Sequence, residues 1–293
     1  MRIDPPRRAS PGGPGRRVSD FLAFGGLVLL GVAVGAYGTL IGAGGGFVLT
    51  PALLLLYPGR EPEVITAISL GVVFFNAVSG SAAYGHQKRI DYSSALMFAA
   101  STMPGAVLGA FLTEHFPRDA FESAFGILLI TVAIWLALPR PSRVIVSQPP
   151  RRYLRRELTD HHGDTYVYSF DPYLGVAFGL AIGFVSSLFG VGGGIIYVPS
   201  MVLLMRFPAY IATATSTFTL MFTSGAGAMV HLTQGHYEDV VGEELALALG
   251  VLVGAQLGAL ASVRLQSRQM VVLRLLSGAL ALVGLRLAFG GLL

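Results

Sequence analysis

Long apolar segments make up most of the sequence, and the polar loops between them are short except for one in the middle of the chain. A helix needs about 20 apolar residues to cross about 30 Å of hydrocarbon. Of the 293 residues, 53% are hydrophobic and only 12% are charged, which is too little polar surface for a soluble domain of this length. The sequence therefore predicts an all-α polytopic membrane protein. Its apolar segments cover 21–57, 63–85, 92–113, 119–138, 172–206, 208–233, 240–262 and 269–290.

The first segment of each half is too long for one simple helix. Segments 21–57 and 172–206 each contain consecutive glycines and a proline, residues at which a helix weakens or breaks. We therefore expect broken or re-entrant first segments within two repeated four-helix halves. This gives about eight net transmembrane spans.

The basic loops set the expected orientation. If each long segment crosses once in net, the N-terminus, the loop His86–Asp91, the arginine-rich linker and the C-terminus share one side, which the positive-inside rule makes cytoplasmic. Arg264 and Arg268 fall on the other side and count against this layout. If each long segment crosses twice, each half has five spans and the halves are inverted. We favour eight spans in a prokaryotic inner membrane, with both termini cytoplasmic.

Charge and composition divide the chain into four regions. The arginine clusters of the tail and linker flank membrane spans, where they set topology more often than they bind nucleic acid. Within the linker, Tyr166-Val167-Tyr168 predicts a short strand, and the absence of cysteine excludes disulfides and thiolate metal sites. The regions are a basic N-terminal tail (1–20), a first transmembrane repeat (21–138), a cytoplasmic linker loop (139–171) and a second transmembrane repeat (172–293).

The two halves resemble each other in sequence. When the second half is laid over the first, the glycine run Gly190–Gly194 falls on Gly42–Gly46, and Pro199 falls on Pro51. The agreement continues along the following segments, which indicates an internal duplication. Further matched pairs are Ser69 with Ser216, Asn76 with Thr223, and Tyr84 with His231.

Paired glycine runs inside membrane segments are typical of a transporter's binding site. Consecutive glycines let the backbone leave the helix, so amide N–H groups become free at the start of the next half-helix. Free amides at the positive end of a helix dipole bind anions without a buried lysine or arginine. The alternative is that these glycines only allow close helix packing. A nucleotide-binding loop is excluded because no Gly-Lys-Ser/Thr follows.

Polar side chains near the glycine runs complete the candidate site. We expect the backbone of both runs and the matched hydroxyl and amide side chains to bind substrate, and we expect no catalytic residue, cofactor or metal. His231, Tyr84 and Lys88 are candidates for gating or proton-linked steps, and Pro51 and Pro199 for structural breakers. The substrate-binding candidates are Gly44, Gly45, Gly46, Ser69, Asn76, Gly192, Gly193, Gly194, Ser216 and Thr223.

The pattern Gly-x-Gly-Gly-Gly-x-x-x-x-Pro at Gly42–Pro51 and again at Gly190–Pro199, within duplicated halves, resembles the TauE/SafE family of sulfite exporters. The resemblance covers about 25 to 290. It implies a secondary transporter, an exporter of sulfur-containing oxyanions or organosulfonates such as sulfite or sulfoacetate, working by alternating access. A channel for small inorganic anions is the alternative. An enzyme is disfavoured because no span carries paired carboxylates or a nucleophile beside a base. The expected partners are the small anion and the lipid bilayer, and the chain is compatible with a homo-oligomer.

Overall fold

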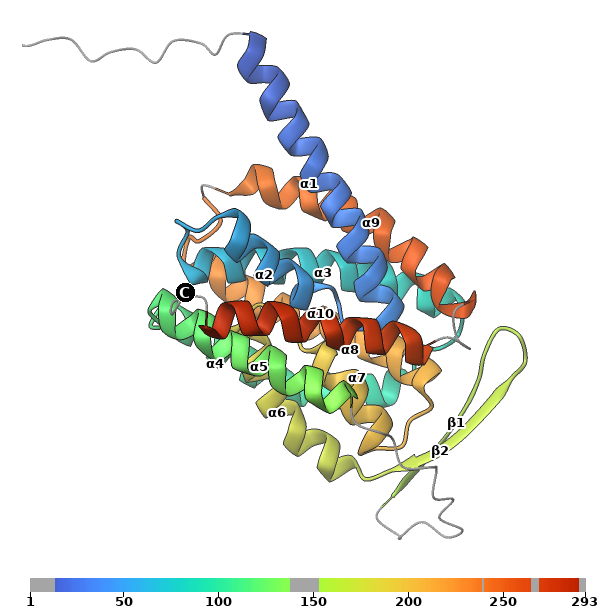
Figure 1. The fold of residues 1–293 in the computed structure, drawn as a ribbon. Coiled ribbons are helices and arrows are strands. Elements are labelled where there is room, and N and C mark those ends of the chain that lie inside the picture. Colours follow the sequence, from blue (N-terminus) through green and yellow to red (C-terminus); the bar gives the residue numbers. More distant parts are fainter. Residues whose placement is uncertain (1–13, 138–152, 239, 265–268, 290–293) are drawn as a thin grey trace, which may run out of the picture.

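The computed structural model describes residues 14–137, 153–238, 240–264 and 269–289, and the chain forms a bundle of helices with one hairpin at its edge (Figure 1). Most of the basic tail and part of the arginine-rich linker lie outside the described residues. The helices are α1 (Pro14–Ile41), α2 (Gly46–Leu56), α3 (Pro62–His86), α4 (Tyr92–Thr113), α5 (Arg118–Ala137), α6 (Pro172–Leu188), α7 (Gly194–Leu203), α8 (Ala209–Thr233), α9 (Val241–Arg264) and α10 (Gln269–Phe289).

Both long apolar segments are broken into two helices at the glycine runs. The first break is the loop between α1 and α2, where Gly42, Gly44 and Gly45 have φ of 78°, 77° and 86°. The second lies between α6 and α7, where Gly190 and Gly193 have φ of 67° and 80°. An L-residue pays a steric penalty in this left-handed region, whereas glycine does not. The helices therefore stop where the sequence predicts.

Each half packs its first helix against the fourth helix of the other half, α1 against α9 and α6 against α4. Glycines make this close approach possible. A Cβ at Gly250 of α9 would clash with the carbonyl oxygen of Val28, and one at Gly105 of α4 with that of Leu180. Small residues allow such contact between membrane helices, where packing replaces the hydrophobic effect.

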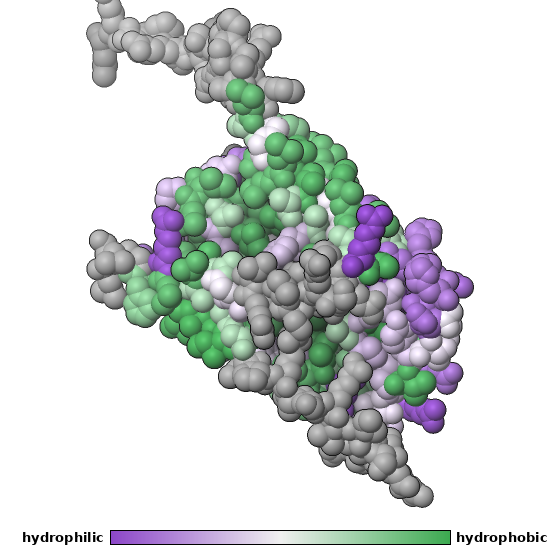
Figure 2. All heavy atoms as spheres, turned by 45° about the vertical axis from the view of Figure 1, so that its right-hand side comes forward, coloured by the Kyte–Doolittle hydropathy of each residue, from purple (hydrophilic) through white to green (hydrophobic). Residues whose placement is uncertain are grey.

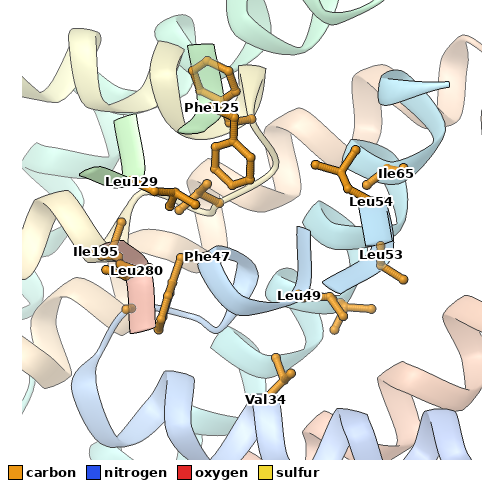
Figure 3. Packing of buried hydrophobic residues seen from close by; sticks show 14 of the residues in the cluster. Val34, Phe47, Leu49, Leu53, Leu54, Ile65, Phe125, Leu129, Ile195 and Leu280 are labelled. Atoms are coloured by element: carbon orange, nitrogen blue, oxygen red, sulfur yellow. The ribbon is translucent and has the colours of Figure 1, made fainter. Parts of the chain in front are cut away.

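The short helices α2 and α7 lie inside the bundle rather than at its edge. Figure 3 shows Phe47 of α2 and Ile195 of α7 in one apolar cluster, together with Leu129 of α5 and Leu280 of α10. Phe47 is fully buried. Helices α3 and α8 pack against each other, as do α5 and α10.

The direction of the helices differs from the eight-span layout. Gly31 of α1 lies against Gly250 of α9, and Ala36 against Gly258, so these helices are parallel. The chain of α3 runs parallel to them too, since Ser79 donates to the carbonyl oxygen of Leu252 and Gln87, just after α3, to that of Ala259. The start of α1 and the loop after α3 therefore lie at opposite ends of the bundle, whereas that layout puts them on one side. Helices α2 and α7 also reverse the chain within the bundle.

A β-hairpin from the linker packs on the end of the bundle where α3 meets α4. Strands β1 (Leu154–Thr159) and β2 (Thr165–Phe170) pair antiparallel, which confirms the strand predicted at 166–168. The Tyr168 hydroxyl donates to Asp91 Oδ2 at 2.8 Å. Burial and the Asp91 carboxylate raise the pKa of Tyr168, so the hydroxyl stays protonated and keeps the hairpin docked.

The outer surface of the helices is apolar. Five of the described helices are long and apolar enough to cross a membrane: α3, α4, α5, α9 and the Leu22–Ile41 part of α1. Figure 2 shows apolar residues over much of one face and hydrophilic residues gathered toward the right of that view. Leu96 and Leu108 of α4 and Leu257 and Leu260 of α9 are among the exposed leucines. Such a surface suits lipid contact, so the chain is a polytopic helical membrane protein.

Candidate functional site

The two glycine loops meet in the centre of the bundle. A Cβ at Gly46 would lie 2.5 Å from the carbonyl oxygen of Gly190, and one at Gly194 would lie 2.5 Å from that of Gly42. Val73 of α3 contacts both loops, because its Cγ1 would lie 3.0 Å from a Cβ at Gly44 and 2.5 Å from one at Gly192. The loops therefore pack backbone to backbone, with no room for side chains between them.

One serine ties each loop to the opposite half of the chain. Ser69 of α3 donates to the carbonyl oxygen of Gly190 at 2.6 Å. Ser216 of α8 donates to the carbonyl oxygen of Gly42 at 3.1 Å. These matched residues thus fix the loops through carbonyls, which leaves the amide side of each loop for other partners.

Asn76 holds the first loop from α3. Its Nδ2 donates to the carbonyl oxygen of Gly44 at 3.1 Å, and its Oδ1 accepts from Thr39 Oγ1 at 3.2 Å. The Asn76 side chain is fully buried, so both bonds satisfy groups that water does not reach. In the structure Asn76 is therefore a positioning residue for the loop.

The amide groups at the end of each loop, where the next helix begins, are unpaired, whereas those of Gly42, Ala43, Gly190 and Val191 have backbone acceptors. Gly44 N donates to the carbonyl oxygen of Gly38 at 3.2 Å. Within the part of the chain that the structure describes, the amides of Gly45 and Gly46 and of Gly192–Gly194 have no hydrogen-bond acceptor. These amides open α2 and α7, so the positive ends of two buried half-helices lie in the same region. Such a place suits an anion.

The structure spreads four other predicted residues over the bundle. Thr223 shares a 2.7 Å hydrogen bond with Thr102 of α4. Tyr84 donates at 2.6 Å to the carbonyl oxygen of Thr39, which also accepts from Gly42 N of the first loop, whereas His231 lies near the end of α8. Lys88, in the loop after α3, is exposed. These side chains are therefore not part of one cluster.

The prolines do not mark the breaks. Pro51 lies inside α2 and Pro199 inside α7, each one and a half turns from the first helical residue. Because proline has no N–H, each leaves one helical carbonyl without its usual donor. The breaks themselves fall at the glycines, where φ is positive.

Arg89 is the charged residue whose role the sequence does not reveal. It is 1% exposed, and its guanidinium lies 3.5 Å from the ring centre of Tyr210 and 4.5 Å from that of Tyr84. It also donates to Ser262 Oγ at 2.7 Å and to the carbonyl oxygen of Tyr210 at 2.9 Å. Burial lowers the pKa of Arg89. This cation joins the α3–α4 loop to α8 and α9 at the hairpin end.

Charged side chains stay away from the glycine loops. The ion pairs of the described residues lie near the ends of helices, as Arg60 with Glu243 at 2.6 Å shows. Among these residues no group of three or more His, Asp or Glu is placed to hold a metal ion. The centre of the bundle therefore offers neutral donors rather than charged ligands.

A polytopic bundle with two broken helices meeting at a buried, donor-rich centre defines a membrane transport protein. The family model described as "Sulfite exporter TauE/SafE" matches residues 27–287. The chain therefore belongs to the TauE/SafE family, a family of membrane transporters rather than enzymes.

Curated relatives carry matching descriptions. The "Probable membrane transporter protein YunE" of Bacillus subtilis is 34% identical over 272 residues, which cover 91% of this chain and 97% of the relative. The "Probable membrane transporter protein MJ0441" of Methanocaldococcus jannaschii is 27% identical over 274 residues, 88% of this chain and 93% of the relative. No solved structure shows significant similarity to the chain.

Proposed function

We propose that this chain is a secondary transporter that exports a sulfur-containing oxyanion or organosulfonate, such as sulfite or sulfoacetate, across a prokaryotic inner membrane. The observation that carries the proposal is the set of unpaired amides at the starts of α2 and α7. A buried amide without a partner costs about 1 to 3 kcal/mol. An oxyanion has several acceptor oxygens, so one anion can accept from several such amides at once.

Neutral donors suit transport because the site must release its substrate as well as capture it. A helix N-terminus contributes about 0.3 to 2 kcal/mol to anion binding, depending on burial, so two of them attract an anion without trapping it. A buried lysine or arginine would bind it more tightly and slow release. The substrate class is taken from the family, whose model is named for sulfite export.

We propose ten membrane segments in two inverted halves. Helix α5 runs antiparallel to α10, since Gly126 lies against Ala288 while Ile130 lies against Gly284, so the end of α10 and the start of α1 share one face. Among the described residues, the loops between helices at the other end, with their flanking residues, hold only Arg60 and Arg118, whereas the hairpin end is more basic, so the positive-inside rule makes that end cytoplasmic. Its basic residues are Lys88, Arg89, Arg155, Arg156, Arg206 and Arg264. A fluorescent protein fused to the C-terminus should then stay dark, whereas a bright fusion would contradict this orientation.

Alternating access in this fold moves groups of helices drawn from both halves. Helices α1, α3 and α9 pack together, and so do α6, α8 and α4, with α3 against α8 between the groups. The glycine loops lie at this boundary and are tied to the opposite half through Ser69 and Ser216. We therefore expect the two groups to rock about the loops, rather than the first half to rock against the second.

Transport by purified protein in proteoliposomes tests the proposal. Vesicles loaded with unlabelled sulfite should accumulate labelled sulfite by counterflow, with saturable kinetics, and sulfoacetate should compete. Because a channel conducts without counterflow, currents far above carrier turnover would favour the channel alternative. Failure of sulfite, sulfoacetate, thiosulfate and sulfate to exchange would contradict the proposed substrate class.

A further inference from the structure

The two glycine loops differ in the side chain that lies beside them. Laying Gly190 over Gly42 places Ser186 over Gly38. At the first loop a Cβ on Gly38 would clash with Gly45 N, so the backbone of the loop itself fills that position. At the second loop the Ser186 side chain occupies it. A Cβ on Gly193 would lie 3.0 Å from Ser186 Oγ.

The Ser186 hydroxyl is buried without a partner. Its residue is 0% exposed, and its Oγ has no hydrogen bond within the described residues. A helical serine usually donates to the carbonyl four residues earlier, as Ser200 does to Ile196 at 2.7 Å and Ser224 does to Leu220 at 2.6 Å. An unpaired buried hydroxyl beside free amides therefore marks a place where a ligand with acceptor oxygens can bind.

Thr66 of α3 also has an unpaired buried hydroxyl and lies beside the second loop. Its hydroxyl is also fully buried and unpaired, and its Cα would lie 3.1 Å from a Cβ on Gly190. The matched residue at the first loop, Thr213, instead donates to the carbonyl oxygen of Ala209 at 2.8 Å. The unpaired hydroxyls near the loops thus gather at the second loop.

The first loop is satisfied to a greater extent. The Gly44 amide donates to Gly38, and the Gly44 carbonyl accepts from Asn76. These bonds fasten the loop to α1 and α3. The second loop therefore has one more free amide than the first, because Gly192 N has no acceptor where the matched Gly44 N has one.

We propose that the transported anion binds asymmetrically, against the second loop, with Ser186 Oγ as a direct ligand. This placement rests on the proposed function. The amides of Gly192–Gly194 and the Ser186 hydroxyl donate to the oxygens of one oxyanion head group, and Thr66 donates from α3. Because the donors are neutral and converge on one loop, the group recognised is a compact oxo head such as sulfite or the sulfonate of sulfoacetate.

Sulfite binding to the full-length protein in nanodiscs tests the placement, with Ser186→Ala as the probe and Ser200→Ala as the matched control. Loss of a hydrogen bond to an anion should weaken sulfite binding about tenfold or more in Ser186→Ala. Ser200→Ala should bind as the wild type does, because its hydroxyl is already paired. Removing an unpaired hydroxyl should leave the melting temperature of the sulfite-free protein unchanged or raise it.

A second variant and the wild type separate the ways in which the idea can fail. Thr66→Val should weaken sulfite binding in the same direction. If the wild type binds sulfite and both variants bind it equally well, the asymmetric placement is wrong while the proposed function stands. If the wild type binds neither sulfite nor sulfoacetate, the proposed function fails and the placement fails with it.

Discussion

The carbonyl oxygen of Gly190 has two hydroxyl neighbours, and this redundancy gives a quantitative prediction. Ser69 Oγ donates to it at 2.6 Å, while Thr50 Oγ1 lies 2.9 Å from Ser69 Oγ and 3.1 Å from the same carbonyl. A hydroxyl has one proton, so Thr50 donates either to Ser69 Oγ or to the carbonyl at any moment. When Ser69 is replaced by alanine, Thr50 can turn to the carbonyl. When Thr50 is replaced by valine, Ser69 keeps its hydrogen bond to the carbonyl.

Each single substitution should therefore cost little. Hydrogen bonds between membrane helices contribute about 0.6 kcal/mol on average, and the typical value in proteins is about 1 kcal/mol. Ser69→Ala and Thr50→Val should each lower the free energy of unfolding by about 1 kcal/mol. The double variant leaves the Gly190 carbonyl buried and unpaired, which adds about 1 to 2 kcal/mol. The total should be about 3 to 4 kcal/mol.

Reversible unfolding in mixed micelles, followed by circular dichroism, measures this double-mutant cycle. Thr131→Ala is the control, since Thr131 is exposed and its Oγ1 donates to the carbonyl oxygen of Ile127 within α5. This substitution should change the free energy of unfolding by less than about 0.5 kcal/mol. Two additive single effects, within about 0.5 kcal/mol, would refute the shared carbonyl. A coupling above about 1 kcal/mol supports it.

Two further substitutions test the packing of the loops and the buried cation. Gly46→Ala places a Cβ 2.5 Å from a backbone oxygen of the second loop, so the helices should fail to pack and the variant should give no monodisperse peak in size-exclusion chromatography. Gly59→Ala adds a Cβ in open space and should elute as the wild type does. Arg89→Lys keeps the charge but loses the planar stacking on Tyr210. It should lower the melting temperature by several degrees, and an unchanged value would show that the stacking contributes nothing.

The breaks of the long segments could be predicted from sequence because they depend on local backbone conformation. Only glycine adopts the required φ without strain, and the runs at Gly42–Gly46 and Gly190–Gly194 mark both breaks. Ser69 and Ser216 were found through the match between the halves. Which way the other matched residues face depends on the rotation of each helix, and the sequence match does not give this. Thr223, for example, faces α4 rather than the loops.

Contacts between distant parts of the chain could not be predicted in this way. The packing of α1 on α9 joins residues more than 200 positions apart in the sequence. The hydropathy of a segment does not indicate which other helix it packs against. The number of membrane segments depends on α2 and α7, which have 11 and 10 residues and are too short to register as spans. Arg89 looked like a topology signal because its aromatic partner Tyr210 lies in the other half.

Long-wavelength anomalous diffraction from crystals soaked in sulfite tests the central claim most directly. The chain has no cysteine and 8 methionines, so the methionine sulfurs calibrate the signal and a bound sulfite adds a separate peak. The account predicts that peak within hydrogen-bonding reach of the amides of Gly192–Gly194. A peak at the hairpin end beside Arg89, with nothing at the glycine loops, would contradict it.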